Sequence, residues 1–336
     1  MTFPTLAKTW QFIPNYAITA TGTPLGTNRT ILKQLKDAFT TTANWVNSSN
    51  ASITPSNMWT TRYSCNSTVA GSAGDGVDRW SAITDLVFAN AGSAHSWYVF
   101  RHTAIDTNCE LLLSCEGLAS NAQNITLVLS PSAGFTGGTT TARPTATDEI
   151  VVINNTTWGG VVNTDTNVKL HIMKSSDGQC WRFFVANGGQ INTAILVEKA
   201  AALHGSWTHQ AVALGLGTSG ATNILTQGNL NTTASINGRG ASNMTMYLAG
   251  PGANNALLNA AITTPNDLSL EWPFLSQQLY SITASNRGVH GYLQDIWYGS
   301  TTTVSGSTCP TTGTQHQFVQ FGSLLLPWCQ VAAQMT

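Results

Sequence analysis

Residues 168 to 186 read VKLHIMKSSDGQCWRFFVA, and this pattern is the clearest structural signal in the chain. Two runs of apolar and β-branched residues, Val168 to Lys174 and Gln179 to Ala186, flank a short polar break that contains Asp177-Gly178. An Asp-Gly pair between two strand-like runs is among the strongest local signals for a β-hairpin. The sequence therefore predicts that these two strands pair antiparallel.

Similar short runs recur along most of the chain, separated by clusters of Gly, Asn, Ser, Thr and Pro. Besides the two runs of the hairpin they are His95 to Thr103, Cys109 to Glu116, Asn124 to Ser130, Glu149 to Asn154, Ala194 to Glu198, Ala211 to Leu216, Asn243 to Leu248, Gln278 to Thr283, Tyr292 to Tyr298 and Gln317 to Leu325. Many short strands at this spacing are typical of sandwiches and barrels. We expect an all-β protein, an antiparallel, jelly-roll-like β-sandwich with one or two short helices and extended terminal arms.

Two segments have helical periodicity. After Asn28, a candidate N-cap, apolar residues recur at helical spacing on one side of the chain: Ile31, Leu32, Leu35 and Phe39. A weaker pattern covers Asp78 to Phe88, where Asp78 is the candidate cap. We expect a short amphipathic helix at the first segment and a less regular one at the second.

The two ends differ in composition from the middle. Residues 1–74 are expected to form an N-terminal arm with the short helix, 75–298 the β-sandwich core, and 299–336 a C-terminal arm. Residues 300–313 are almost purely polar, whereas Leu324-Leu325-Leu326-Pro327-Trp328 is too apolar to remain in water. We expect this tail to dock on its own sandwich or on a neighbouring subunit.

Charge is scarce in this sequence. Its 336 residues include 14 Lys+Arg and 15 Asp+Glu, so 9% are charged where about 25% is usual. Thr (48), Ser (28), Asn (27) and Gly (30) supply about two residues in five, and 42% of the chain is hydrophobic, so a folded core is expected. A net charge of -1 without basic clusters argues against nucleic acid or an anionic membrane as a partner. The sequence shows neither a spanning apolar stretch nor a signal peptide at Met1 to Ile13, so we expect a soluble protein.

The residues that could carry catalysis form no recognisable motif. The six cysteines lack metal-binding spacing and are expected as buried thiols, with Cys309 and Cys329 the one pair worth testing for a disulfide. Glycoside cleavage needs two carboxylates about 5 to 10 Å apart, which the sequence does not display. Asp75, Asp78 and Asp85 could form a site with distant partners, although Asp78 as a helix cap beside Arg79 is the simpler interpretation. The histidines are expected to be structural, and we assign no catalytic, cofactor-binding or metal-binding residue and no cofactor.

The 11 tryptophans allow two interpretations. Aromatic rings stack on sugars, and Asn, Thr and Asp bind sugar hydroxyls, so a neutral Trp-rich sandwich could bind glycans. Most of the tryptophans, such as Trp97, Trp181 and Trp297, alternate within strand patterns, which favours core packing. Trp158, beside two glycines, and Trp207, between Ser206 and Thr208, are the better candidates for exposed rings.

Three segments carry a resemblance to a known group of proteins: DGVDRW at 75–80, GSAHSW at 92–97, and SPSAGFTGGTTTARPTATDE at 130–149. The region from residue 75 to about 190 resembles uncharacterised structural proteins encoded in the genomes of tailed bacteriophages. The resemblance implies a virion component of the tail or the head-to-tail region, made in the host cytoplasm, and it assigns no functional residue.

We therefore expect a structural subunit of a bacteriophage virion, a tail, collar or decoration component that forms homo-oligomers and contacts other virion proteins. Low charge reduces repulsion between identical copies, and exposed sheet edges allow neighbours to add strands. The alternative is a glycan-binding host-adhesion module on the same kind of particle, and a third interpretation is a polysaccharide-degrading enzyme. Within the resembling region, Phe135 to Thr147 forms a long excursion, in which Arg143 is expected to pair with a nearby carboxylate or to contact an adjacent subunit.

Overall fold

The computed structural model describes residues 6–17, 24–66, 68–82, 95–117, 123–156, 169–187, 190–199, 201–202, 211–217, 246–248, 275–281, 288–298, 308–309, 317–321 and 324–329. These residues are mostly β-structure and include one α-helix. The strands form three sheets, and all their pairings are antiparallel. The all-β prediction is therefore confirmed for the described part of the chain.

Sheet I is a meander in which each strand pairs with its neighbour in sequence. Its strands are β2 (Thr60–Asn66), β3 (His95–Arg101), β4 (Glu110–Gly117), β5 (Gln123–Ser130) and β6 (Ile150–Thr156). The strand β2 lies in the region 1–74, which is expected from the sequence to be an N-terminal arm.

Sheet II has the order β1-β7-β8-β9-β11. Its strands are β1 (Trp10–Ala17), β7 (Lys169–Ser175), β8 (Cys180–Asn187), β9 (Gln190–Lys199) and β11 (Ala211–Gly217). The hairpin predicted at Asp177-Gly178 is confirmed, because β7 and β8 pair antiparallel across it and Gly178 adopts a positive φ of 74°. The N-terminal strand β1 pairs with β7, with Trp10 opposite Ser175.

Sheet III has the order β12-β13-β14-β17-β16-β15, and β10 pairs with β14 beside this path. Its strands are β10 (Ala201–Ala202), β12 (Met246–Leu248), β13 (Leu275–Ser281), β14 (Gly288–Tyr298), β15 (Thr308–Cys309), β16 (Gln317–Phe321) and β17 (Leu324–Trp328). The run Gln317 to Leu325, predicted as one strand, is instead divided between β16 and β17, which pair with each other from Phe321 and Leu324 onward.

The helix α1 (Pro24–Thr40) buries the side chains predicted for its apolar face, Ile31, Leu32, Leu35 and Phe39. It begins before Asn28, so Asn28 lies inside the helix and is not its N-cap. The second predicted helix is wrong where the structure describes it, since residues 78–82 are not helical. The rest of that segment, 83–88, lies outside the described residues.

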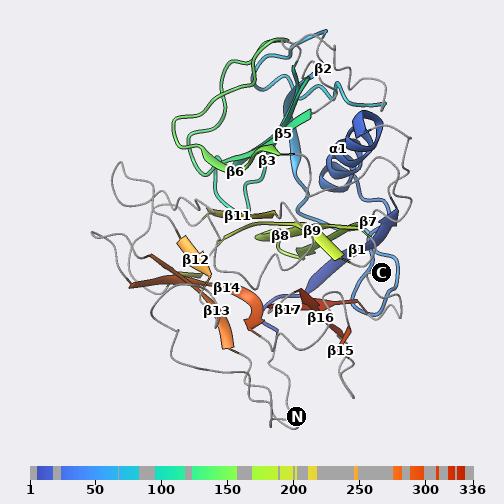
Figure 1. Cartoon of the computed structure of the whole chain (residues 1–336), viewed down its shortest axis with the longest axis vertical. Helices are drawn as coiled ribbons and strands as arrows, with labels where there is room; N and C mark the ends of the chain where they lie inside the picture. The colour runs from blue at the N-terminus through green and yellow to red at the C-terminus, as the bar shows by residue number, and fades with distance from the viewer. Residues whose placement is uncertain are drawn as a thin grey trace.

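The three sheets are arranged in layers with sheet II in the middle (Figure 1). Side chains alternate along β7, so that Leu170 and Ile172 join a core shared with sheet I and α1, while His171 faces the other way, toward Trp328 of sheet III. Phe39 of α1 fills the first core, with its ring 5.4 Å from that of Phe100 in sheet I and 5.5 Å from that of Trp181 in sheet II.

The outer face of sheet I has its own smaller core. Tyr63, Cys65, Trp97, Val99, Leu112 and Val128 are buried there under the segment that follows β5, which contributes Phe135. The apolar tail of the chain is also buried: Trp328 packs edge-on against Phe12 of β1 with ring centroids 5.4 Å apart. The tail therefore docks on its own chain.

Candidate functional site

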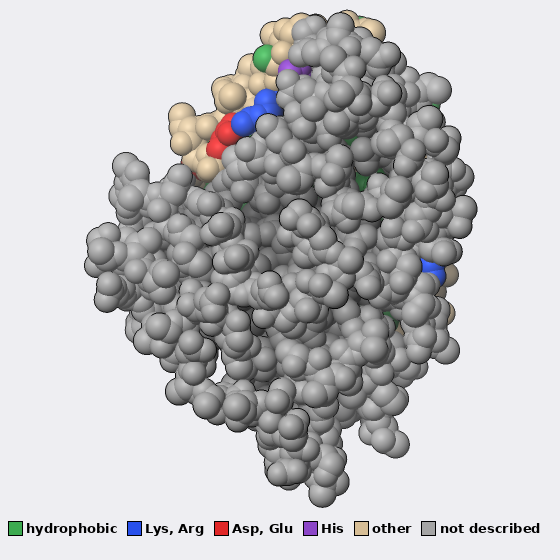
Figure 2. Space-filling view, in the orientation of Figure 1, with side chains coloured by type: hydrophobic (Ala, Val, Ile, Leu, Met, Phe, Trp, Pro, Cys, Tyr) green, Lys and Arg blue, Asp and Glu red, His purple; other side chains and the backbone are tan. Residues whose placement is uncertain are grey.

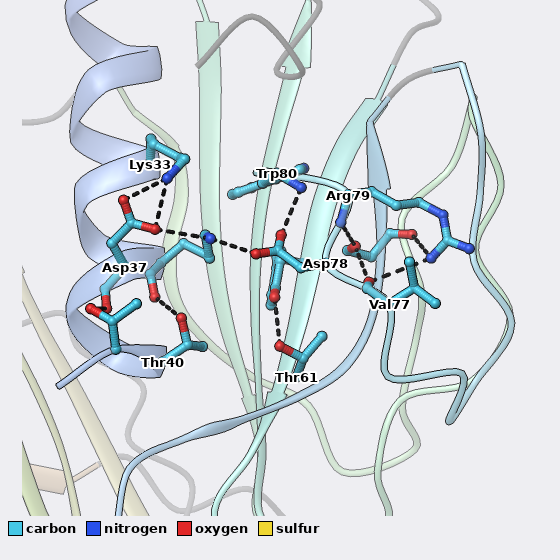
Figure 3. A network of polar contacts seen from close by, with 12 residues as sticks. Lys33, Asp37, Thr40, Thr61, Val77, Asp78, Arg79 and Trp80 are labelled. Atoms are coloured by element: carbon cyan, nitrogen blue, oxygen red, sulfur yellow. Dashed lines mark hydrogen bonds and ion pairs between the residues drawn. The ribbon is translucent and has the colours of Figure 1, made fainter. Parts of the chain in front are cut away.

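Two carboxylates of the described residues converge on one buried lysine. Lys36, on the last turns of α1, places Nζ 2.6 Å from Oδ2 of Asp78 and 2.9 Å from Oδ1 of Asp37. Asp37 is also bound by Lys33, one helical turn earlier, at 2.5 Å. Figure 3 shows these side chains bridging the helix and the segment that runs along sheet I. The cluster of Lys33, Lys36, Asp37 and Asp78 is called the lysine bridge below.

Local structure fixes both ends of the lysine bridge. Asp78 uses its other oxygen, Oδ1, to accept the backbone N–H of Trp80 at 2.8 Å, and the indole of Trp80 in turn donates to the Cys65 carbonyl. Burial of Lys36 alone would lower the pKa of its ammonium, but hydrogen bonds to Asp78 and Asp37 outweigh this and raise the pKa. The lysine therefore stays charged and occupies the space between the two carboxylates.

This arrangement does not leave two acids facing a water molecule or a substrate. Asp78 is one of the carboxylates that the sequence offers for a catalytic site. In the structure the Lys36 ammonium lies between Asp78 and Asp37, which is the geometry of a structural ion-pair network. Asp75 pairs separately with Arg79 at 2.9 Å, and this contact, with the Val77 and Ser72 amides, overcomes the effect of burial and lowers the pKa of Asp75. Asp85 lies outside the described residues. Asp37 was missed in the sequence because its role depends on a segment 41 residues further along the chain.

A second cluster joins sheets II and III. Arg182 is fully buried, binds Oε2 of Glu198 through Nη2 at 2.9 Å, and lies with its Cζ 4.4 Å from the Trp10 ring centre. It also donates to the backbone carbonyls of Gln294 and Asp295 in β14. The Asp295 carboxylate accepts the N–H groups of Ala7, Lys8 and the Trp10 indole. Every one of these polar groups is therefore matched by a partner from another element.

A third cluster joins sheet II to the loop that precedes β2. Lys174 is buried between the rings of Trp45 and Trp181, with Nζ 5.6 and 5.5 Å from their centroids, and donates to the Ser56 carbonyl at 2.7 Å. Burial lowers the pKa of Lys174 to about 8, against the opposing effect of Asp177. Beside it, His102 bonds to the Asn57 carbonyl at 2.9 Å.

A fourth cluster lies on the outer face of sheet I, where Glu110 is fully buried. Its Oε1 accepts hydrogen bonds from Arg62 Nε at 3.1 Å and from Arg101 Nε and Nη2 at 2.9 and 2.7 Å. Its Oε2 accepts the backbone N–H of Phe135 at 2.7 Å. Two guanidinium groups thus share one carboxylate.

The long excursion after β5 is held by two adjacent carboxylates that serve different groups. Asp148 accepts the Ser130 and Ser132 hydroxyls and two backbone N–H groups at the start of the excursion. Glu149 binds Arg143 through both of its oxygens, each at 2.9 Å, so the expected pairing of Arg143 with a nearby carboxylate is confirmed.

The described cysteines and tryptophans are in the interior. Cys65, Cys109, Cys115, Cys180 and Cys329 are buried, as expected. The side chain of Cys309 lies outside the described residues, so its pairing with Cys329 stays a prediction. Burial raises the pKa of the Cys109 and Cys180 thiols, which makes them poor nucleophiles. Seven tryptophans whose side chains are described are at most 2% exposed: Trp10, Trp45, Trp59, Trp80, Trp97, Trp181 and Trp328. Trp158 and Trp207, the candidates for sugar stacking, lie outside the described residues.

The described surface reflects the low charge of the chain. In Figure 2 it shows mainly uncharged groups, and basic side chains lie directly beside acidic ones at the upper left. No group of three or more His, Cys, Asp or Glu side chains in the described ranges is arranged to hold a metal ion. Within the same ranges no helix is both long and apolar enough to cross a membrane.

No protein-family model matches the chain, and no curated protein matches it at a significant level.

Proposed function

We propose that this protein is a structural subunit of a bacteriophage virion that works by assembling with copies of itself and with other virion proteins, without catalysis. The resemblance of residues 75 to about 190 to phage structural proteins supports a place in the virion. The low charge supports close packing of identical copies. We further propose that sheets I and II are the two layers of a β-sandwich, with the core around Phe39 between them. The protein would be made in the host cytoplasm and reside in the virion.

The edges of the sheets carry this proposal. At one edge of sheet I, the chain covers β2 with its own loop: the N–H groups of Gly71 and Gly76 bond to the carbonyls of Ser64 and Arg62. At one edge of sheet II, Phe12 of β1 exchanges two backbone hydrogen bonds with Val46. These two edges are therefore closed to another chain.

The opposite edges, β6 and β11, lie side by side, and no described strand pairs with either on its outer side. Neither IVVINNT nor AVALGLG contains a charged residue. Exposed edge strands usually carry charges or proline that prevent pairing between chains. Uncharged edges of this kind suit the addition of strands from a neighbouring subunit.

Native mass spectrometry and light scattering on the full chain test the proposal. We expect a defined homo-oligomer, and we expect a lysine at the β6 edge, in the Asn155→Lys variant, to lower its mass. The matched control is Ala73→Lys, which adds the same charge to an exposed position in the loop that covers β2. Circular dichroism verifies that both variants fold. A stable monomer at high concentration would contradict the proposal.

Glycan adhesion remains the alternative proposal. It requires exposed aromatic rings, and the seven described tryptophans named above are buried. Binding of the full chain to a panel of host-surface polysaccharides distinguishes the two: adhesion predicts saturable binding that persists in the Asn155→Lys variant, whereas the assembly role does not require it.

A further inference from the structure

The charge on the outer face of sheet I is not balanced within the described chain. Arg62 and Arg101 both bind Glu110, and no second described carboxylate lies within ion-pair distance of either guanidinium. One carboxylate neutralises only one of the two cations, so the cluster keeps a net positive charge. Most other ionic clusters described above pair one basic group with at least one acidic group.

The arginine donors are only partly used. Arg101 directs both Nε and Nη2 at the same carboxylate oxygen, which leaves Nη1, and Arg62 uses Nε alone. In the described residues no acceptor lies within hydrogen-bond distance of Nη1 or Nη2 of Arg62. The side chains of Arg62 and Arg101 are 25% and 32% exposed, so both guanidinium groups are partly accessible to solvent.

The two guanidinium groups are held in place by buried or backbone groups. Glu110 is 0% exposed and is itself fixed by the Phe135 N–H, so it acts as a rigid anchor. Arg62 lies over Gly74, where a Cβ would come within 2.1 Å of Nη1, and Gly74 has a φ of +92°. The backbone around residue 74 thus leaves room for the Arg62 guanidinium and for no side chain. Such prior ordering lowers the entropic cost of binding a ligand.

We propose that Arg62 and Arg101 form a binding site for one small oxyanion, a phosphate group or a carboxylate such as that of an acidic sugar. The paired N–H groups at the end of a guanidinium match two oxygens of such a group. A single excess charge suits one oxyanion and not a polyanion, whose binding relies on many phosphate contacts. This inference does not depend on the proposed role in assembly.

The test measures the thermal stability of the full-length protein with increasing sodium phosphate, against sodium chloride at the same ionic strength. A ligand that binds only the folded state stabilises it by RT ln(1 + [L]/Kd), so the melting temperature rises with ligand concentration. We expect phosphate to stabilise the wild type, and we expect Arg62→Gln to weaken binding at least about tenfold, the loss expected for a charge-assisted bidentate contact. Each variant is compared with its own melting temperature in chloride, so that a loss of basal stability does not affect the result.

Two matched pairs sharpen the test. Arg79→Gln removes an arginine that has its own carboxylate partner, Asp75, and should leave the phosphate effect unchanged. Gly74→Ala should displace Arg62 and weaken binding, whereas Gly76→Ala, which also has a positive φ but has no atom within 4 Å of the added Cβ, should not.

The same melting experiment with glucuronate and with glucose distinguishes a carboxylate-bearing sugar from phosphate as the source of the oxyanion. Stabilisation by glucuronate and not by glucose identifies a carboxylate-bearing sugar as a ligand, while an effect of phosphate alone identifies the free anion. Equal responses to phosphate and chloride in the wild type, or an unchanged phosphate response in both Arg62→Gln and Gly74→Ala, would overturn the proposal. Because oligomer mass is measured separately, failure here leaves the assembly proposal intact.

Discussion

At the scale of single residues, His102 shows how burial fixes a protonation state. The ring is 3% exposed, Nε2 lies 2.9 Å from the Asn57 carbonyl, and Nδ1 accepts the N–H of Ala104 at 3.3 Å. A neutral imidazole with its proton on Nε2 satisfies both contacts, whereas a second proton on Nδ1 would face the Ala104 N–H. Burial, opposed by the Asn57 carbonyl and assisted by Lys174, lowers the pKa of His102 to about 4.

We predict that this histidine makes the fold sensitive to acid. The unfolded chain binds a proton near pH 6.5 and the folded chain near pH 4, so stability from this group is complete above pH 6.5 and falls as the pH decreases toward 4. The loss amounts to about 3 kcal/mol at most. Urea unfolding between pH 7 and 4 should show a shallower decline for His102→Gln than for the wild type. His171, with a pKa lowered to about 3 by burial, contributes equally in both proteins.

The lysine bridge gives a second prediction at this scale. Lys36→Met removes the ammonium between Asp37 and Asp78 and should lower the free energy of unfolding by about 2 kcal/mol, because two partly buried carboxylates lose a charged partner. Lys33→Met is the control, since an i, i+4 pair on a helix contributes only about 0.5 kcal/mol. Urea unfolding of both variants measures the difference. Equal effects would show that Lys36 is no more important than a surface lysine.

At the scale of elements, the segment between β5 and β6 acts as a cover for sheet I. Phe135 is 1% exposed in the outer core, and the segment closes on itself through two backbone hydrogen bonds between Thr136 and Thr145. The Trp97 indole donates to the Thr139 carbonyl at 2.9 Å. The long excursion is therefore ordered by its own chain.

Adjacent glycines of this segment provide a matched comparison. Both have a positive φ, 72° for Gly137 and 95° for Gly138, but a Cβ on Gly138 would lie 2.8 Å from the Trp97 ring and from Pro144, while Gly137 faces open space. We expect Gly137→Ala to cost about 1 kcal/mol through backbone strain alone. Gly138→Ala should cost at least about 2 kcal/mol because it adds steric overlap in the core. Chemical denaturation of the two variants measures the difference, and equal losses would show that the cover is loosely packed.

At the scale of the whole molecule, the Arg182 cluster decides how sheet III is attached to sheet II. The β14 bulge at Asp295, which has a positive φ of 53°, presents its carbonyl to Arg182 and its carboxylate to the start of β1. Glu198 is 0% exposed and depends on Arg182 for its counter-charge. The junction is therefore a buried ion pair with backbone partners.

We predict that replacing one member of this ion pair destabilises the protein more than replacing both members. Arg182→Met leaves Glu198 buried and unpaired, which should destabilise the protein by about 3 to 5 kcal/mol. The double variant Arg182→Met/Glu198→Met should recover part of that loss, because it leaves no uncompensated charge. Urea unfolding monitored by tryptophan fluorescence checks both. A double variant less stable than the single one would contradict the prediction.

The sequence identified strands wherever local periodicity and turn chemistry agreed. Each of the twelve predicted runs overlaps a strand, and the apolar face of α1 is the one expected from Ile31 and Phe39. The strands β1 and β2 were missed, because WQFIPNYA includes a proline and TTRYSCN is largely polar. These segments are strands because β1 pairs with β7 and β2 pairs with β3, and both partners are distant in sequence.

Composition and neighbouring residues are enough to predict the β-rich class, the hairpin at Asp177-Gly178, the buried cysteines and the scarcity of charge. The pairing of charges, by contrast, follows from the fold. Asp78 lies 42 residues from Lys36, Glu110 lies 48 from Arg62, and Gln294 lies 112 from Arg182. Such contacts depend on how sheets stack and which edge a strand joins, and local periodicity carries no information about either.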